Sequence, residues 1–268
     1  MEELINELKS KERFNIDDLV NVVIVLRSEN GCPWDKVQTH KSIKKDFLEE
    51  VYEVMEAIDC DSPEMMREEL GDVLLQVVFH TVIEQEQEHF VLEDVITELC
   101  QKLIVRHPHV FGDVQADTVD KVLTNWDSIK KETKGQETYT DTLKSVPKNF
   151  PALMRAQKLG KRSSRARDDF SHDKAGQLKA FNLLNAESNS LHETIADGNE
   201  DQQKEALGDL LFACCNTARA LGLDAEEALS ESSERYIKRF EKAESKGEKM
   251  SDISFDDLDI LWRNGKES

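Results

Sequence analysis

One acidic pattern occurs twice in this chain, and it constrains the fold more than any other feature. The first copy occupies residues 48–53 and 68–72, and the second occupies residues 185–190 and 205–209. The copies are 137 residues apart, both from position 49 to 186 and from position 72 to 209. A spacing shared by two separate motifs indicates an internal duplication, so we expect two related halves.

The duplication predicts two domains, residues 1–137 and 138–268, each of ordinary size and able to bury its own core. The second copy has lost three acids of the first: Glu49, Glu53 and Glu69 are replaced by Ala186, Ser190 and Ala206. We therefore expect an intact acidic metal site in the N-terminal domain and a degenerate one in the C-terminal domain.

Helical periodicity runs through nearly the whole chain, and no segment alternates as a strand would, which predicts an all-α fold with one helical bundle per domain. The helices predicted in the first half span about 16–28, 40–59, 62–87, 91–106 and 118–131. Within 40–59 the apolar residues form one stripe that we expect to face the core. Residues 135–151, which contain one glycine and two prolines, are the predicted linker.

The net charge of −20 argues against binding to nucleic-acid polymers, which need a cationic surface. It still permits free nucleotides, because a divalent cation can bridge acidic side chains and phosphate. The five cysteines are an odd number without a CxxC pair, and we expect them to be reduced and buried in a cytoplasmic protein. We expect neither a signal peptide nor a membrane-spanning segment.

The first acidic copy has the spacing of a metal site. Glu49, Glu50 and Glu53 share one arc of a helix, and Glu69 and Asp72 share an arc of the next. If the two helices pack antiparallel, the arcs converge, and clustered carboxylates favour Mg²⁺ or Mn²⁺ over zinc.

The alternative interpretation is that the glutamates form a solvated helix face. Asp72 favours a site, because the apolar residues 73–79 follow it and a buried carboxylate needs a partner. A structural ion pair would also satisfy Asp72. Gly71 disfavours the helix, so we expect that packing or function requires it.

Cations and tryptophans recur in both halves at matching spacing. Lys102 and Arg106 lie one helical turn apart, as do Trp126 and Lys130. The corresponding residues in the second half are Arg235, Arg239, Trp262 and Lys266. Paired cations suit phosphate oxygens, and an aromatic ring suits a nucleobase. The alternative for each residue alone is a core anchor or a surface charge.

Four motifs together resemble the MazG family of nucleoside triphosphate pyrophosphohydrolases. They are Cys32-Pro33-Trp34-Asp35, Glu49-Glu50-x-x-Glu53, Glu69-x-x-Asp72 and the segment Arg106-His107-Pro108-His109-Val110-Phe111. The resemblance covers essentially the whole chain. It implies helical-bundle domains, a homodimer, and Mg²⁺-dependent cleavage of an NTP or dNTP to the monophosphate and pyrophosphate, with Mn²⁺ as a substitute. Broad specificity and a role in nucleotide-pool control would follow.

The resemblance also implies residue roles. The metal ligands would be Glu50, Glu53, Glu69 and Asp72, and the catalytic base would be one of Glu49, Glu50 and Glu53. The nucleotide contacts would be Lys102, Arg106, Trp126 and Lys130, with Arg235, Arg239, Trp262 and Lys266 as further candidates.

Two other functions compete with this prediction. One is a catalytically silent member that binds nucleotide or regulates, which the interrupted acid set of the C-terminal half would suit. The other is a redox-metal bundle, which needs a Glu-x-x-His pair that neither acidic helix contains.

Overall fold

A computed structural model describes residues 1–114, 118, 121–122, 138–166 and 170–244 of the chain. All regular structure within these residues is helical, which confirms the predicted all-α class. The chain forms two compact units, Met1–Ile129 and Lys130–Ser268. This division lies close to the predicted domain boundary, while the duplication itself stays a prediction.

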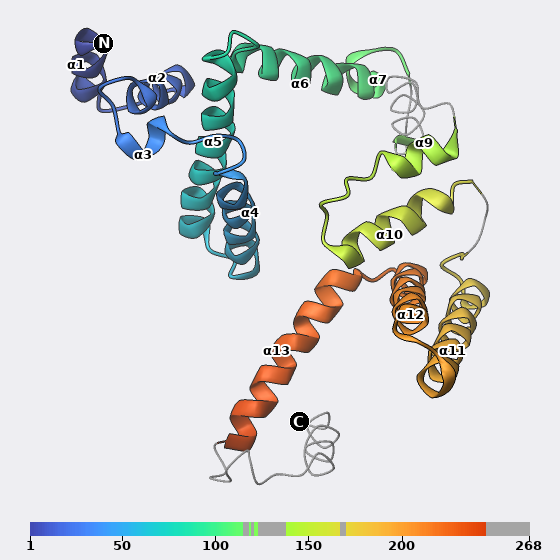
Figure 1. Ribbon diagram of the computed structural model, residues 1–268. Coiled ribbons are helices and arrows are strands. Elements are labelled where there is room, and N and C mark those ends of the chain that lie inside the picture. Colours follow the sequence, from blue (N-terminus) through green and yellow to red (C-terminus); the bar gives the residue numbers. More distant parts are fainter. Residues whose placement is uncertain (115–117, 119–120, 123–137, 167–169, 245–268) are drawn as a thin grey trace. The chain divides into compact units, whose positions relative to one another are not determined.

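The first unit is built from seven described helices (Figure 1). They are α1 (Glu2–Ser10), α2 (Ile16–Arg27), α3 (Pro33–Lys36), α4 (Lys44–Asp59), α5 (Pro63–Gln85), α6 (Leu92–Arg106) and α7 (Pro108–Phe111). The α5 helix begins as its sequence predicts, because the Ser62 hydroxyl accepts a hydrogen bond from the Met65 backbone N–H and Pro63 occupies the first turn. Asp61 adopts φ 48°, which aspartate tolerates, in the short turn from α4 to α5.

The core of this unit lies between α2 and the C-terminal half of α5. Its buried residues are Val23, Ile43, Val78, Phe79, Val82, Ile83 and Leu92. The N-terminal half of α5 takes no part in this core and packs beside α4 instead (Figure 1). The hairpin of α4 and α5 therefore extends from the core as two paired helices.

Arg27 ties three segments of this unit together. Its guanidinium donates to both carboxylate oxygens of Glu86 at 2.7 Å and to the backbone carbonyls of Asp35 and Gln38. It also lies over the Phe79 ring, 5.1 Å from the centroid. The Arg27 side chain is only 5% exposed, so this network fixes the segment around α3 against the end of α5.

The second unit repeats this order of packing. Its described helices are α9 (Tyr139–Lys144), α10 (Ala152–Ser163), α11 (Lys174–Asp197), α12 (Glu200–Leu221) and α13 (Ala225–Glu244). The α11 and α12 helices pack as a pair, as α4 and α5 do, and α10 packs against α12 as α2 packs against α5. Small residues line the α11–α12 contact, where Ala180 and Ala213 are fully buried. A duplication would produce this correspondence.

Several details differ from the expectations. The second helix starts at Lys44 rather than near residue 40, because Thr39 and Ser42 bond to each other in a turn. The predicted linker contains α9, whose Thr138 cap bonds the Asp141 backbone N–H. Of the apolar stripe on α4, Ile43 is buried whereas Val51 and Ile58 are exposed, so the stripe only partly faces the core.

The cysteines are free, as predicted, but three of them are exposed rather than buried: Cys60, Cys100 and Cys214. Among the described residues, no helix combines the length and the apolar character needed to cross a membrane.

Replacing Arg27 with leucine tests the role of its network. Removing the buried guanidinium leaves Glu86 and two carbonyls without their donor, although Glu86 can still reach water. We expect the free energy of unfolding to fall by about 2–3 kcal/mol, below the usual loss for a fully buried pair. Glu7→Gln is the control, because its exposed i,i+4 pair with Lys11 should change stability by less than about 0.5 kcal/mol. Equal effects in urea unfolding would contradict this account.

Candidate metal centre

Three carboxylates from two helices converge in the first unit. Glu50 of α4 and Glu69 and Asp72 of α5 each offer an oxygen, and these oxygens lie within 4.8 Å of one another. All three residues are half-buried. The convergence follows from the sequence, because the short turn at residues 60–62 makes α4 and α5 antiparallel and spacings of three and four residues keep each set on one arc.

Glu53 completes the acidic cluster through hydrogen bonds to Glu50 and Glu69. Burial, the hydrogen bond to Glu53 and the charge of Asp72 raise the pKa of Glu50 to about 7. Burial and the charges of Glu53 and Glu68 also raise the pKa of Glu69. The four acids therefore repel one another when ionised, and a cation among them would relieve that repulsion.

Three of the acids are half-buried, which disfavours the alternative of a solvated helix face for them. Glu49 and Glu53 are exposed on α4, whereas Glu50, Glu69 and Asp72 turn toward the helix contact. None of the salt bridges among the described residues includes Asp72, so these residues supply no structural ion pair for it.

Packing against the described residues does not explain Gly71. A Cβ atom added there would meet no atom within 4 Å, and the same holds for Gly208 at the matching position of α12. The neighbouring Leu70 and Leu74 are exposed as well. The described residues therefore supply no packing that requires a glycine at position 71.

The predicted cations lie on α6, which leaves from the C-terminal end of α5 (Figure 1). Lys102 is exposed, and Arg106 is half-buried with an Nε atom that has no hydrogen-bond partner. The acids lie in the N-terminal half of α5, so nothing described brings the two cations to them within one chain. Trp126 and Lys130 lie outside the described residues.

The second unit does not rebuild the cluster from its described residues. Ala186, Ser190 and Ala206 stand on α11 and α12 at the positions of the lost acids. Arg235 is exposed and pairs with Glu231 at 3.1 Å, while Arg239 is half-buried on the same helix, α13. Trp262 and Lys266 lie outside the described residues.

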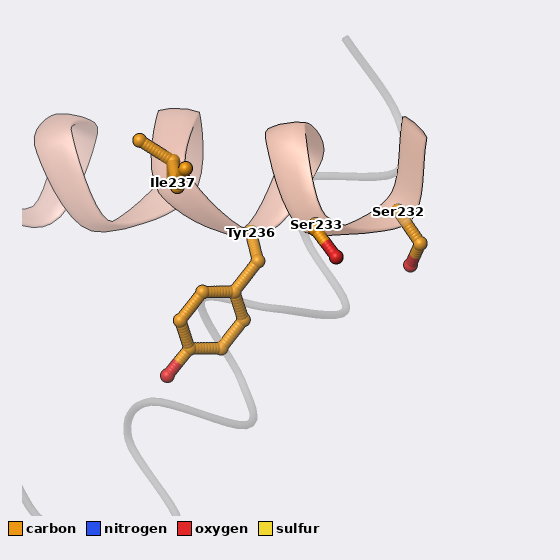
Figure 2. Close-up of a pocket in the computed structure, with 4 residues that line it drawn as sticks. All are labelled: Ser232, Ser233, Tyr236 and Ile237. Atoms are coloured by element: carbon orange, nitrogen blue, oxygen red, sulfur yellow. The ribbon is translucent and has the colours of Figure 1, made fainter. Parts of the chain in front are cut away.

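A hollow of about 400 Å³ lies along α13, but it has no catalytic character. Figure 2 shows that the four labelled residues come from one helix: Ser232, Ser233, Tyr236 and Ile237. These described residues offer hydroxyl groups and no carboxylate, so the hollow is distinct in kind from the acidic cluster.

Sequence reasoning missed a histidine network beside the cluster. His40 Nδ1 lies 2.7 Å from His80 Nδ1, and His40 Nε2 lies 2.6 Å from Glu84. The second Glu84 oxygen lies 2.6 Å from His89 Nδ1. A partial signal existed, since His80 and Glu84 are one turn apart on α5, but nothing in the spacing placed His40 there.

Comparison with known proteins identifies the family of the chain. The model of the MazG nucleotide pyrophosphohydrolase domain matches residues 38–111, which include both acidic helices. A nucleoside triphosphate pyrophosphohydrolase of Escherichia coli K12 is 37% identical over 256 residues, covering 94% of this chain and 97% of that protein. The chain belongs to the MazG family.

Two further relatives extend the comparison. The nucleoside triphosphate pyrophosphohydrolase/pyrophosphatase MazG of Thermotoga maritima is 37% identical over 254 residues, 93% of this chain and 95% of that protein. The uncharacterized protein YabN of Bacillus subtilis is 39% identical over 252 residues, 92% of this chain. The chain spans about half of YabN, 51% of its length.

The raised pKa of Glu50 predicts a pH-dependent stability of the metal-free protein. A folded-state pKa of about 7, above the ordinary value of 4.5, means that the neutral carboxyl favours the fold. Its stabilising contribution is complete below pH 4.5 and is lost as the pH rises through 7. We expect the melting temperature in EDTA to fall over this window and Glu50→Gln to flatten the fall. Added Mg²⁺ should restore stability at pH 8 in the unchanged protein only. A fall of equal size in Glu50→Gln would contradict the assignment.

Proposed function

We propose that the protein is a Mg²⁺-dependent nucleoside triphosphate pyrophosphohydrolase, which converts an NTP or dNTP and water to the monophosphate and pyrophosphate. The observation that carries the proposal is the convergence of Glu50, Glu69 and Asp72 on a helix pair that the MazG domain model spans. The names of the Escherichia coli and Thermotoga maritima relatives support the same reaction. A broad substrate range and a cytoplasmic role in nucleotide-pool control belong to the proposal.

The donor set fits a hard divalent cation. Its atoms are carboxylate oxygens without a thiolate or imidazole among them, as Mg²⁺ and Mn²⁺ prefer. Glu50, Glu69 and Asp72 would hold the ion, with Glu53 as the fourth ligand. When bound, the ion supplies charge neutralisation at the triphosphate and polarises the phosphorus that water attacks.

A glutamate of α4 would also act as the catalytic base. One of Glu49, Glu50 and Glu53 accepts a proton from the attacking water, which adds to the α-phosphorus while pyrophosphate leaves. Glu49 and Glu53 are exposed and so can reach a water outside the ligand set. Positioning a water in this way is what a site built only of carboxylates can contribute to phosphoryl transfer.

Lys102 and Arg106 bind phosphate oxygens, and Trp126 and Lys130 contact the nucleoside and its phosphates. The free Nε atom of Arg106 supports this role, because a half-buried guanidinium without a partner is suited to an anion. The position of α6, away from the acids of its own chain, leaves open which copy supplies these cations.

A homodimer would explain two observations: the position of α6 away from the acids of its own chain, and the exposed apolar side of α6. Ile96, Leu99 and Leu103 form an apolar stripe along α6 that its own chain leaves exposed. The α4–α5 hairpin exposes a second apolar face at Leu48, Val51, Tyr52, Met55, Ile58, Leu70 and Leu74. Gly71 lies on this hairpin with open space around it. We propose that a second copy covers these faces, which would bring its α6 toward the acids.

The C-terminal half contributes affinity or assembly rather than chemistry. It lacks the three acids that became Ala186, Ser190 and Ala206, yet it keeps Arg235, Arg239, Trp262 and Lys266 at the spacing of the first half. Loss of metal ligands with retention of phosphate-binding and base-binding residue types is the pattern of a non-catalytic nucleotide-binding copy.

Glu53→Gln tests both the reaction and its location. Removing one charge of the cluster while keeping its shape should lower turnover with Mg²⁺ at least 100-fold, in the range typical for loss of a catalytic acid or base. Chromatography of ATP and dCTP digests by the unchanged protein should show only monophosphate and pyrophosphate. Arg13→Gln, far from the acids in sequence and exposed, is the control. Full turnover by Glu53→Gln would reject the N-terminal site, and a diphosphate product would reject the reaction.

Leu99→Asp tests the homodimer. A charge in the exposed stripe of α6 cannot be buried against a second copy without a large cost, so we expect sedimentation at micromolar concentration to change from dimer to monomer. Glu93→Gln, on the exposed first turn of the same helix, should leave the dimer intact. A Leu99→Asp protein that sediments like the unchanged protein would exclude α6 from the interface.

A further inference from the structure

We infer that the hydrogen-bonded chain His80–His40–Glu84–His89, here the histidine clamp, is a positioning device that sets the geometry of the acidic cluster. The inference rests on the proposed metal site and adds to it residues that no ligand or base role includes. His40 precedes α4, His80 and Glu84 lie on α5, and His89 follows α5. The clamp therefore joins the approach to α4 to the C-terminal half of α5.

All three contacts of the clamp can be hydrogen bonds at the same time. An ionised carboxylate only accepts, so Glu84 receives one N–H from His40 Nε2 and one from His89 Nδ1. Nδ1 of His40 and Nδ1 of His80 then share one proton, so one ring donates and the other accepts. Burial and the charge of His40 lower the pKa of His80, which favours a neutral His80 ring. The hydrogen bond from His89 and that from His40 lower the pKa of Glu84, which keeps the acceptor ionised.

The clamp lies directly beside the metal centre along the helix pair. The His80 ring contacts the Phe47 ring of α4, with centroids 5.7 Å apart. Phe47 is one turn before Glu50 on α4, and His80 is two turns after Asp72 on α5. Because the helices are antiparallel, Phe47 and His80 face each other at one point of the α4–α5 contact. Glu50 and Asp72 meet further along the same contact.

The acids need such a device. Four carboxylates on facing helices repel one another before a cation binds, and Ala57 is the only buried residue of α4 that opposes their separation. The core fixes α5 and Ile43, the residue just before α4. The clamp holds His40 at the same end and so limits how far Glu50 can move from Asp72.

His80→Leu and His80→Asn separate positioning from packing. Leucine fills space without donating a hydrogen bond, whereas the asparagine amide can replace the Nδ1–H group. We expect the dissociation constant for Mn²⁺ alone, measured by calorimetry at pH 7.5, to rise about 10-fold or more in His80→Leu, as for other residues that orient metal ligands. His80→Asn should return most of that loss. His40→Ala, at a more exposed position, should also weaken Mn²⁺ binding and serves if His80→Leu does not fold.

Lys11→Met is the matched control for stability. It breaks the Lys11–Asp18 ion pair between α1 and α2, where Asp18 is buried, and it does not touch the hairpin of α4 and α5. We expect it to lower the melting temperature and leave Mn²⁺ affinity unchanged. If Mn²⁺ affinity merely follows melting temperature across all variants, or if His80→Asn is as weak as His80→Leu, the positioning role is wrong.

The outcome separates the clamp from the proposed function. A protein that binds Mn²⁺ with the expected variant pattern but hydrolyses no nucleotide retains the clamp and loses the pyrophosphohydrolase proposal. A protein in which His80→Leu and His40→Ala bind Mn²⁺ normally, while Glu53→Gln abolishes turnover, loses the clamp and retains the function. A protein that binds no Mn²⁺ at all overturns the clamp together with the metal centre.

Discussion

Repulsion among the carboxylates between α4 and α5 is the constraint on which the first unit depends. Two unit charges about 5 Å apart repel by about 3–4 kcal/mol at an effective dielectric near 20. Burial is the largest cause of the raised pKa of Glu50, and the hydrogen bond to Glu53 and the charge of Asp72 add to it. A helix pair with this much charge at its contact cannot be held by that contact alone. It must be held elsewhere, and the rest of the unit meets this need.

The restraints lie at the other end of the hairpin. The C-terminal half of α5 packs into the core through Val78, Phe79 and Val82, and Arg27 ties the segment before α4 to Glu86. Rigid anchoring at one end leaves the acids at the other end preorganised but not satisfied, which is the arrangement a metal site needs. The same design leaves the hairpin with apolar residues uncovered in one chain. The anchoring at one end of the hairpin therefore accounts both for the stable core and for the unsatisfied acids at the other end.

The sequence predicted the elements well and their surroundings less well. Helical periodicity identified α2, α4, α5 and α6, and the Ser62-Pro63 start of α5 was predicted from its capping chemistry. The convergence of Glu50, Glu69 and Asp72 needed only helix spacing and a short turn. These features are local, so residue order alone determines them.

Long-range features escaped prediction for a physical reason. The stripe on α4 was expected to face the core, yet Val51 and Ile58 are exposed, because periodicity reports which side is apolar and not what covers it. His40 reaches Glu84 across 44 residues, and no spacing rule connects positions so far apart. Gly71 was expected to serve packing or function, and among the described residues nothing packs against it.

The second unit shows that the helix pair can form without the full set of acids. It keeps the helix pair α11–α12 and the open glycine, Gly208, but lacks most of the acids. Ala180 and Ala213 are buried in this pair, as Ile43 and Gln76 are at the corresponding positions of the first unit, so the two units differ at the level of the acids and not there. In the first unit the half-buried carboxylates of Glu50, Glu69 and Asp72 occupy the level of the acids, and the proposed histidine clamp limits how far α4 and α5 can separate. The position that holds Glu69 in α5 holds buried Ala206 in α12, so one substitution both removes a ligand and adds to the helix contact. The predicted duplication would make the loss of this ligand and the gain of an apolar contact at Ala206 a single physical change.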